Sequence, residues 1–137
     1  SGMPIWGATP TQKGVARAMA DRAKGVEAVI NLGDNFYITG VMSDSDPRVN
    51  TTFKDVYKGT AVPWLIIAGN HDHLGNVSAQ MSYTNKSKLW YFPALYYNKI
   101  YHKEDVSVEF VMLDTVELCG NNVDVQTGKL WDVIREL

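Results

Sequence analysis

The sequence predicts an α/β fold with a mixed sheet. In the first half of the chain, helical patterns alternate with short apolar runs, which is the order of helices packed on parallel strands. In the second half, two longer strand-like runs follow each other closely, which predicts an antiparallel hairpin. The chain has 137 residues, of which 45% are hydrophobic and 20% charged, enough for one domain with a hydrophobic core.

The first helix is predicted to begin near Thr9. Thr9 can cap the helix, Pro10 suits its first position, and Gln12 stands where a capping box places a polar partner. Apolar side chains then recur at helical spacing: Val15, Ala16, Met19, Ala20 and Ala23. Gly25 is a typical C-terminal stop, so the helix is expected to end there.

Short elements separated by turn residues follow this helix. The apolar run 29–32 predicts a first strand, and the run 64–68, introduced by Pro63, predicts a second, buried strand. Between them, the polar stretch 39–50 is expected to be a surface loop, and 51–58 a short helix. This short helix is expected to turn three side chains inward: Phe53, Val56 and Tyr57.

The second half of the chain is expected to pair strands. Residues 77–83 predict a helical turn, and 90–93 an aromatic cluster that ends in a turn. The runs 96–102 and 106–113 are separated by three charged residues and predict the hairpin. At the end of the chain, 127–137 places apolar residues on one helical face and predicts an amphipathic helix.

Composition excludes some classes of partner. The net charge of −2 gives no basic field for nucleic acid or an anionic membrane, and no apolar stretch approaches the length of a membrane span. No signal peptide is visible in the chain. Cys119 is the single cysteine, so it is either a free thiol or half of a bridge to something outside this chain. Three N-x-Ser/Thr triplets, at Asn50, Asn76 and Asn85, would be glycan acceptors in a secreted protein.

The most informative segments are two polar loops of matching design. Residues 33–37 (GDNFY) follow the first predicted strand, and residues 69–73 (GNHDH) follow the second. Each loop starts with glycine and continues with side chains that bind cations. Open α/β sheets bind their ligands at the carboxyl ends of strands, so the two loops predict one shared site.

Three side chains in these loops are predicted metal ligands. The Asp34 carboxylate can bridge two cations with its two oxygens. The Tyr37 phenolate is an unusual ligand that favours Fe(III) over Zn or Mg, and the Asn70 amide oxygen suits a divalent ion. Each residue alone would also fit an ordinary turn, but two loops with complementary ligands favour a metal site.

The remaining polar side chains of the second loop have roles that the residues leave open. His71 can be a metal ligand, a phosphate donor or a general acid. Asp72 is expected to orient an imidazole, as carboxylates around metal sites do, and His73 to extend the same face. Taken alone, His73 would more often be a structural or solvated side chain.

Five segments carry a resemblance to a known family. Residues 33–37 and 69–80 are similar to the two central motifs of the calcineurin-like metallophosphoesterases, and Tyr37 narrows the resemblance to the purple acid phosphatases. The chain resembles the small, tartrate-resistant type found in animals. The similarity extends to three more segments: 52–57, 62–64 and 111–121.

The resemblance implies a four-layer α/β/β/α sandwich and a dinuclear centre of Fe(III) with Fe(II), Zn or Mn. By this match Asp34 bridges both ions, Tyr37 binds Fe(III) and Asn70 binds the divalent ion. His71 is the implied catalytic residue, and Asn70 and His71 contact the phosphate of a phosphate monoester. A secreted or lysosomal protein is expected, in which Asn76 is a candidate glycosylation site.

The resemblance covers the N-terminal half of the family's domain. The family pattern begins with Gly-Asp-x-Gly and adds Gly-His-x and Gly-His-x-His in a C-terminal half, and this sequence contains none of these motifs. The other histidine, His102, lacks their flanking residues. Residues 1–137 are therefore expected to be an incomplete domain, inactive alone and short of metal or metal-free, because affinity depends on the number of ligands. In the family, the cysteine that matches Cys119 pairs with one in the missing half.

The favoured interpretation is an acid phosphatase whose other half lies in the same precursor or in another chain. The non-catalytic alternative is a pseudoenzyme or secreted fragment that acts as a binding or oligomerisation module, with its exposed sheet as the homodimer interface. The enzymatic alternative is a phosphodiesterase of the same superfamily. Such sites usually lack a tyrosine ligand, and the charge balance does not suit a polyanion, so this alternative is disfavoured.

Overall fold

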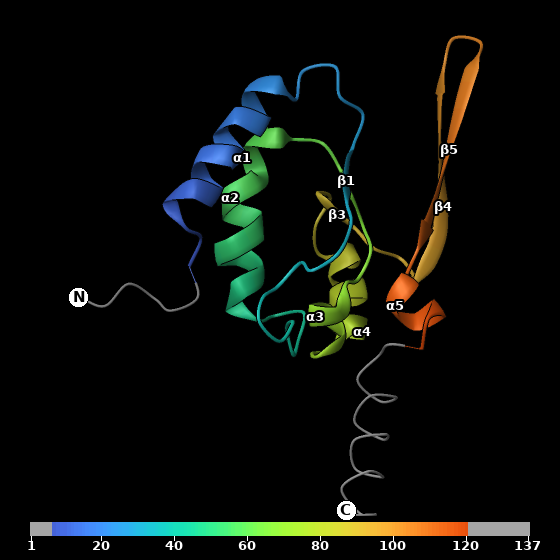
Figure 1. The fold of residues 1–137 in the computed structure, drawn as a ribbon. Coiled ribbons are helices and arrows are strands. Elements are labelled where there is room, and N and C mark those ends of the chain that lie inside the picture. The colour runs from blue at the N-terminus through green and yellow to red at the C-terminus, as the bar shows by residue number, and fades with distance from the viewer. Residues whose placement is uncertain (1–6, 121–137) are drawn as a thin grey trace, which may run out of the picture.

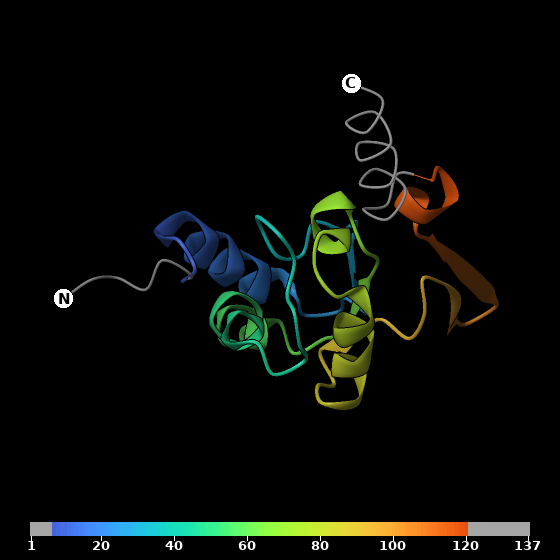
Figure 2. The ribbon, with the colours of Figure 1, turned by 90° about the horizontal axis from the view of Figure 1, so that it is seen from below.

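In the computed structural model, which describes residues 7–120, helices and a hairpin flank a small parallel sheet. Figures 1 and 2 show helices α1 and α2 on one side of this sheet and strands β4 and β5 on the other. The longer helices and the hairpin strands are α1 (Pro10–Arg22), α4 (Val77–Ser82), β4 (Tyr96–Lys103) and β5 (Val106–Leu113). The shorter elements are α2 (Asp55–Tyr57), α3 (Asn70–His73), α5 (Thr115–Leu118), β1 (Val29–Asn31), β2 (Trp64–Ile66) and β3 (Trp90–Tyr91).

The predicted α/β class is confirmed. The parallel and antiparallel strand pairs expected in one mixed sheet form two separate sheets within residues 7–120. In the first sheet the order is β1-β2-β3, all parallel, with Val29 opposite Trp64 and Trp64 opposite Trp90. The central strand β2 is buried along its whole length. Because parallel strands end at one edge, the loops after β1 and β2 leave the sheet side by side.

Helix α1 begins as the sequence predicts. The Thr9 hydroxyl accepts a hydrogen bond from the Gln12 backbone N–H at 3.1 Å, and Pro10 occupies the first turn. The Gln12 side chain does not turn back to complete a capping box. Its Nε2 donates instead to the Thr52 carbonyl at 2.9 Å, which ties α1 to the following helical segment. Gly25 follows the helix with a left-handed φ of +82°, as its position predicts.

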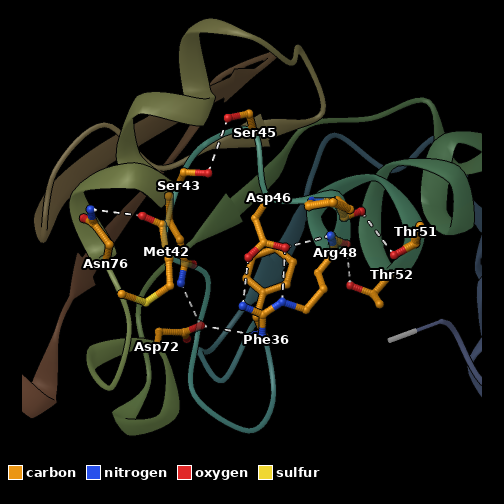
Figure 3. A network of polar contacts seen from close by, with 12 residues as sticks. Phe36, Met42, Ser43, Ser45, Asp46, Arg48, Thr51, Thr52, Asp72 and Asn76 are labelled. Carbon is orange, nitrogen blue, oxygen red and sulfur yellow. Dashed lines mark hydrogen bonds and ion pairs between the residues drawn. The ribbon is translucent and has the colours of Figure 1, made fainter. Parts of the chain in front are cut away.

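The stretch 39–50 is only partly the surface loop that its polar residues predict. Val41 and Val49 are buried in the core. Between them, the Asp46 carboxylate accepts hydrogen bonds from the Arg48 N–H and the Arg48 guanidinium, both at 2.9 Å (Figure 3). This hydrogen bonding to Arg48 holds the pKa of the Asp46 carboxyl below its usual range. The Asp46 and Arg48 side chains bond to each other, while the two valines are buried. The average polarity of the stretch gives no sign of these two buried positions.

The helix predicted at 51–58 is present as three consecutive segments. A π-helical turn at Val49–Lys54 leads into α2 and then into a 3-10 turn at Lys58–Thr60. As predicted, the Phe53 side chain points into the core, and Val56 and Tyr57 are half-buried.

An aromatic core joins this helical layer to the parallel sheet and to the first polar loop. Phe53 packs edge-on against Trp64 and Trp90, with ring centroids 5.3 and 4.8 Å apart. Phe36, from the loop after β1, stacks on the same Trp90 with a centroid distance of 5.7 Å. The loop that carries the candidate ligands Asp34 and Tyr37 is therefore anchored in the core by its own phenylalanine.

The predicted hairpin is confirmed. Strands β4 and β5 pair in antiparallel register from Tyr96 opposite Leu113 to Lys103 opposite Val106. The Tyr97 hydroxyl attaches the hairpin to the parallel sheet, since it lies 3.0 Å from the Ile66 carbonyl and 3.1 Å from the Tyr91 carbonyl. Burial raises the pKa of the Tyr97 phenol.

The hairpin also carries exposed apolar side chains. Four of them alternate along the two strands on the face away from Tyr97: Tyr96, Ile100, Val111 and Leu113. Within residues 7–120, every helix is too short or too polar to cross a membrane. The helix predicted at 127–137 lies outside the described residues.

Candidate metal centre

Two glycines bring the predicted site loops into direct contact. Gly33 follows β1 with a left-handed φ of +100°, and a Cβ built on it would lie 2.7 Å from the Gly69 nitrogen. A Cβ built on Gly69 would overlap the Asp34 carboxylate. The contact is between backbones, which cannot move aside as a flexible side chain can. Glycine at both positions therefore lets the two strand-end loops lie against each other, as one shared site would require.

The Asp34 carboxylate links the two loops. Its Oδ2 accepts a hydrogen bond from the Tyr37 hydroxyl at 2.8 Å, and its Oδ1 accepts one from the His71 backbone N–H at 3.1 Å. This hydrogen bond to Asp34 raises the pKa of the Tyr37 phenol, and burial and the negative charges of Asp34 and Asp72 raise it further. One proton therefore lies between the Asp34 carboxylate and the Tyr37 oxygen. A metal cation could replace this proton and bind both oxygens.

Two contacts with the first loop hold the His71 side chain beside Asp34 and Tyr37. Its Nδ1 lies 2.6 Å from the Ile38 carbonyl oxygen, and its ring centroid lies 4.6 Å from that of Tyr37. A carbonyl oxygen only accepts hydrogen bonds, so Nδ1 carries the proton. His71 Nε2 is left to bind a ligand or to carry a second proton, and only the doubly protonated ring could act as a general acid.

The prediction that Asp72 orients an imidazole is wrong. Asp72 is fully buried, and its carboxylate accepts hydrogen bonds from the backbone N–H groups of Asn35 (2.9 Å), Phe36 (3.2 Å) and Gly69 (2.9 Å) (Figure 3 shows the contact with Phe36). The reason is local. Asp72 stands at the third position of α3, so its side chain folds back onto the N-cap amide of Gly69 and reaches the neighbouring loop.

Two amide side chains complete this buried network. Gln80 Nε2 donates to Asp72 Oδ1 at 2.9 Å, and Asn35 Nδ2 donates to Gln80 Oε1 at 3.1 Å and to the Ile67 carbonyl at 2.9 Å. Gln80 is 1% exposed. Sequence reasoning assigned no role to either residue. The signal in the sequence is weak, because a glutamine in a short helix is usually a surface residue.

The Asp114 carboxylate orients an imidazole, that of His73. His73 Nε2 lies 2.7 Å from Asp114 Oδ2, and the Asp114 side chain is fully buried. Asp114 follows β5 and also caps α5, because its Oδ1 accepts a hydrogen bond from the Glu117 N–H at 3.0 Å. Sequence analysis noted the segment that contains Asp114 but gave this residue no role.

The chain assembles part of a ligand set. Asp34, Tyr37 and His71 are in contact, and the exposed Asn70 stands between His71 and the Gly69 that touches Asp34. A cavity of about 700 Å³ borders Asp34 and Tyr37. Carboxylate, phenol and amide oxygens suit hard cations, so these residues fit one side of a metal centre. Among residues 7–120, no three His, Cys, Asp or Glu side chains cluster closely enough to hold a metal ion.

His102 lies apart from the predicted site residues. His102 Nδ1 lies 2.8 Å from Ser107 Oγ near the far end of the hairpin.

Residues 12–135 of this sequence match the family model described as calcineurin-like phosphoesterase. The chain belongs to this family.

Named relatives of this calcineurin-like phosphoesterase are acid phosphatases. The tartrate-resistant acid phosphatase type 5 of Sus scrofa is 45% identical over 133 residues, covering 87% of this chain and 39% of the relative. The Homo sapiens protein of the same name is 44% identical, covering 87% of this chain and 41% of the relative. Purple acid phosphatase 7 of Arabidopsis thaliana is 37% identical over 67 residues, covering 47% of this chain and 20% of the relative.

A solved structure shares the fold of this calcineurin-like phosphoesterase. It is that of GAP50, the anchor in the inner membrane complex of Plasmodium, with a TM-score of 0.65 and 25% sequence identity. The match covers 80% of this chain and 39% of the GAP50 chain. The chain spans about two fifths of the length of the tartrate-resistant relatives named above.

The three predicted glycan acceptors are all at the surface. Asn50, Asn76 and Asn85 are exposed. Asn76 also caps α4, since its Oδ1 accepts a hydrogen bond from the Ala79 N–H at 3.0 Å. A glycan is attached through the amide nitrogen, so glycosylation of Asn76 is compatible with this cap. Cys119 is an exposed free thiol in the structure.

Proposed function

We propose that the protein to which this chain belongs is a metal-dependent acid phosphatase that hydrolyses phosphate monoesters. The observation that carries the proposal is the Asp34 carboxylate, which contacts the Tyr37 hydroxyl at 2.8 Å and the His71 N–H at 3.1 Å beside a cavity. The names of the tartrate-resistant and purple acid phosphatase relatives support the same activity.

The proposed cofactor is a dinuclear centre of Fe(III) with Fe(II), Zn or Mn. Asp34 would bridge the ions, Tyr37 would bind Fe(III), and Asn70 would bind the divalent ion. When bound, the two cations would neutralise the phosphate group and supply the nucleophile. The donor set supports this assignment, because a phenol already paired with a carboxylate becomes a strong ligand for an acidic cation once its proton leaves.

The residues of this chain would bind the substrate and move one proton. The Asn70 side chain, exposed at the start of α3, would contact a phosphate oxygen. His71 is oriented by the Ile38 carbonyl through Nδ1–H. In its doubly protonated form, the ring would keep this proton and give the second one, on Nε2, to the departing alkoxide. The buried Asp72 would keep both loops in register while this happens.

The domain in residues 1–137 is proposed to be incomplete, with the remaining ligands supplied by another part of the same precursor or by another chain. The absence of three clustered His, Cys, Asp or Glu residues within 7–120 supports this, as does the coverage of about two fifths of the relatives. The isolated chain is therefore expected to be inactive and metal-free or nearly so.

The test is to produce the longer protein that carries this chain and to measure p-nitrophenyl phosphate hydrolysis, metal content and the visible spectrum. We expect turnover, bound iron and a tyrosinate-to-iron absorption band. Tyr37→Phe should lose the band. Asp34→Asn should lower kcat/KM by more than about a hundredfold, beyond the effect typical of residues that only support ligands. Asp44→Asn is the matched control, because Asp44 pairs with Lys86 at the surface and activity should be unchanged.

The outcomes separate the parts of the proposal. No hydrolysis of any phosphate monoester by the metal-loaded protein would reject the phosphatase assignment. A colourless, iron-free protein that still turns over would reject only the Fe(III)–Tyr37 assignment. Faster hydrolysis of bis-p-nitrophenyl phosphate would favour the phosphodiesterase alternative.

The non-catalytic alternative has one structural observation in its favour. Exposed apolar side chains on the hairpin, including Tyr96, Val111 and Leu113, offer a surface for a second copy of the chain. GAP50, which shares the fold, is named as an anchor rather than as an enzyme. Sedimentation of the chain would decide between the two, since a clean monomer would count against obligate pairing through this face.

A secreted or lysosomal location is also proposed. The exposed positions of Asn50, Asn76 and Asn85 support it, because each is accessible to the glycosylation machinery. A loss of mass after endoglycosidase treatment of the secreted native protein would confirm glycan occupancy. A protein that carries no glycan would remove this support.

A further inference from the structure

The contact between His73 and Asp114 joins two parts of the molecule that the proposed chemistry does not connect. His73 is the last residue of α3, the helix that begins with Asn70 and His71. Asp114 lies 41 positions further along the chain, between β5 and α5. The 2.7 Å contact between His73 Nε2 and Asp114 Oδ2 is almost closed to solvent, at 10% and 0% side-chain exposure.

Helix α3 needs such support because it is only four residues long. One turn of helix is not stable alone, since forming the first turn fixes several residues for a single hydrogen bond. Its first end is held by Asp72, whose carboxylate binds the N-cap N–H of Gly69 at 2.9 Å. At its other end, the Asp114 contact is the side-chain hydrogen bond that the structure gives to His73.

Asp114 is itself firmly placed. Its backbone N–H donates to the Leu95 carbonyl at 3.0 Å, and its Oδ1 accepts from the Glu117 N–H at 3.0 Å. An ionised carboxylate only accepts hydrogen bonds, so His73 donates its Nε2 proton to Asp114. The direction of the bond fixes the tautomer and the orientation of the His73 ring.

We infer that Asp114 is a positioning residue for the candidate metal centre, acting through His73. It holds the C-terminal end of α3 and thereby fixes where Asn70 and His71 lie relative to Asp34, which the His71 N–H contacts. This inference rests on the proposed function for its catalytic consequence, but the placement of α3 is a property of the chain alone. It also gives α5 and the start of the hairpin a role in the site, because both hold Asp114.

The central variants separate the two tasks of the Asp114 side chain. Asp114→Ser keeps an oxygen that can cap α5 but is too short to reach His73. Asp114→Asn keeps both contacts, since its oxygen can cap α5 while its amide nitrogen donates to a His73 ring of the other tautomer. His73→Phe keeps a ring and removes the nitrogen.

The first readout is hydrogen exchange in the longer protein. We expect Asp114→Ser to speed exchange of the amides of Asp72, His73 and Leu74, while the capped Glu117 amide stays protected. Asp114→Asn should restore protection of α3. Unchanged exchange in α3 with Asp114→Ser would overturn the inference, whether or not the protein is a phosphatase.

The second readout is catalytic and applies if the parent hydrolyses phosphate monoesters. We expect Asp114→Ser to lower kcat about tenfold, as is typical of residues that support ligands, with a much smaller change in KM. Because Asp114 acts through His73, the double variant with His73→Phe should be no slower than either single variant. Additive losses would show that Asp114 does not act through His73. A lower melting temperature with an unchanged kcat would show a role in stability alone.

A measurement on the parent protein covers the case in which the variants do not fold. The ¹⁵N chemical shifts of the His73 ring report its tautomer. We expect a proton on Nε2, the nitrogen that contacts Asp114. A proton on Nδ1 with a bare Nε2 would overturn the inferred contact, and an inactive parent would reject the proposed function without affecting this result.

Discussion

At the scale of single residues, the candidate site depends on two glycines, Gly33 and Gly69, which have no Cβ atom. Gly33 and Gly69 lie back to back, so that the loops after β1 and β2 touch through their backbones. A Cβ at position 33 would lie 2.7 Å from the Gly69 nitrogen. A residue with a side chain would also have to adopt the left-handed φ of +100° found there. Both conditions oppose every residue except glycine.

We expect Gly33→Ala to lower the free energy of unfolding by about 1–3 kcal/mol, since a strained backbone alone costs that much. Gly14→Ala is the matched control, because Gly14 lies within α1 with open space at its Cβ position. There the substitution should raise stability by about 0.5–1 kcal/mol. Chemical denaturation measures both variants, and equal effects would contradict the close approach of the loops.

The Asp72 carboxylate is expected to be more important for stability than for catalysis. Replacing it by asparagine would point an NH₂ group at N–H donors that now bind oxygen, among them those of Phe36 and Gly69. We expect Asp72→Asn to cost about 3 kcal/mol of unfolding free energy. Asp44→Asn removes an exposed ion pair with Lys86 and should cost no more than about 1 kcal/mol. Denaturant midpoints of the two variants compare these costs, and similar midpoints would reject the role of Asp72.

The candidate ligands could be proposed from the sequence, whereas the side chains that support their loops could not. Asp34, Tyr37, Asn70 and His71 stand in short motifs whose residue types carry the chemistry. Asp114 reaches His73 across 41 positions, and a pattern confined to one loop contains no information about that contact. Asp72 illustrates the same limit, because three of its partners are backbone N–H groups, which nearly every residue type has.

At the scale of elements, the hairpin is held to the parallel sheet by a buried phenol. Tyr97 on β4 bonds to carbonyls at the end of β2 and within β3, at 3.0 and 3.1 Å. We expect Tyr97→Phe to cost about 1 kcal/mol at neutral pH, because two buried carbonyls lose their donor. Tyr96→Phe is the control, since Tyr96 lies on the exposed face of the same strand and its loss of a hydroxyl should change little.

The cost of Tyr97→Phe should depend on pH. Burial raises the pKa of Tyr97 in the folded state, while the unfolded phenol has an ordinary pKa of about 10. Below about pH 10, both states keep the proton and the full stabilisation is present. As pH rises further, the unfolded state loses the proton first, so the parent loses stability that the variant never had. The difference between parent and variant should therefore shrink above pH 10, and a difference that grows would contradict the buried phenol.

Elements could be predicted where one signal dominates. Strong apolar runs predicted β1 and β2, and the two runs around a charged turn predicted the hairpin, whose register only the structure shows. The segment 39–50 was mispredicted in part, because Val41 and Val49 stand singly among polar residues that bond to each other. The separation of the strands into two sheets follows from tertiary packing and leaves no local pattern.

At the scale of the whole molecule, the chain that carries the proposed partial site also exposes apolar surface on its hairpin. The hairpin stands beside the parallel sheet (Figure 1), and side chains such as Val111 and Leu113 are 64% and 44% exposed. A cleft of about 500 Å³ between the hairpin and the sheet is lined mainly by apolar residues, among them Ile30, Leu65 and Phe110. Surfaces of this kind usually face protein rather than water.

Activity is therefore expected of the longer protein and not of residues 1–137 alone. Asp34, Tyr37 and Asn70 offer too few donors to hold two metal ions tightly, since affinity rises with the number of ligands in a preformed cage. We expect the purified chain, incubated with Fe(III) and Zn(II), to show neither the tyrosinate-to-iron band nor hydrolysis of p-nitrophenyl phosphate above a Tyr37→Phe control. The longer protein under the same conditions should show both. Robust turnover by the isolated chain, absent from its Asp34→Asn variant, would prove that residues 1–137 already contain a complete site.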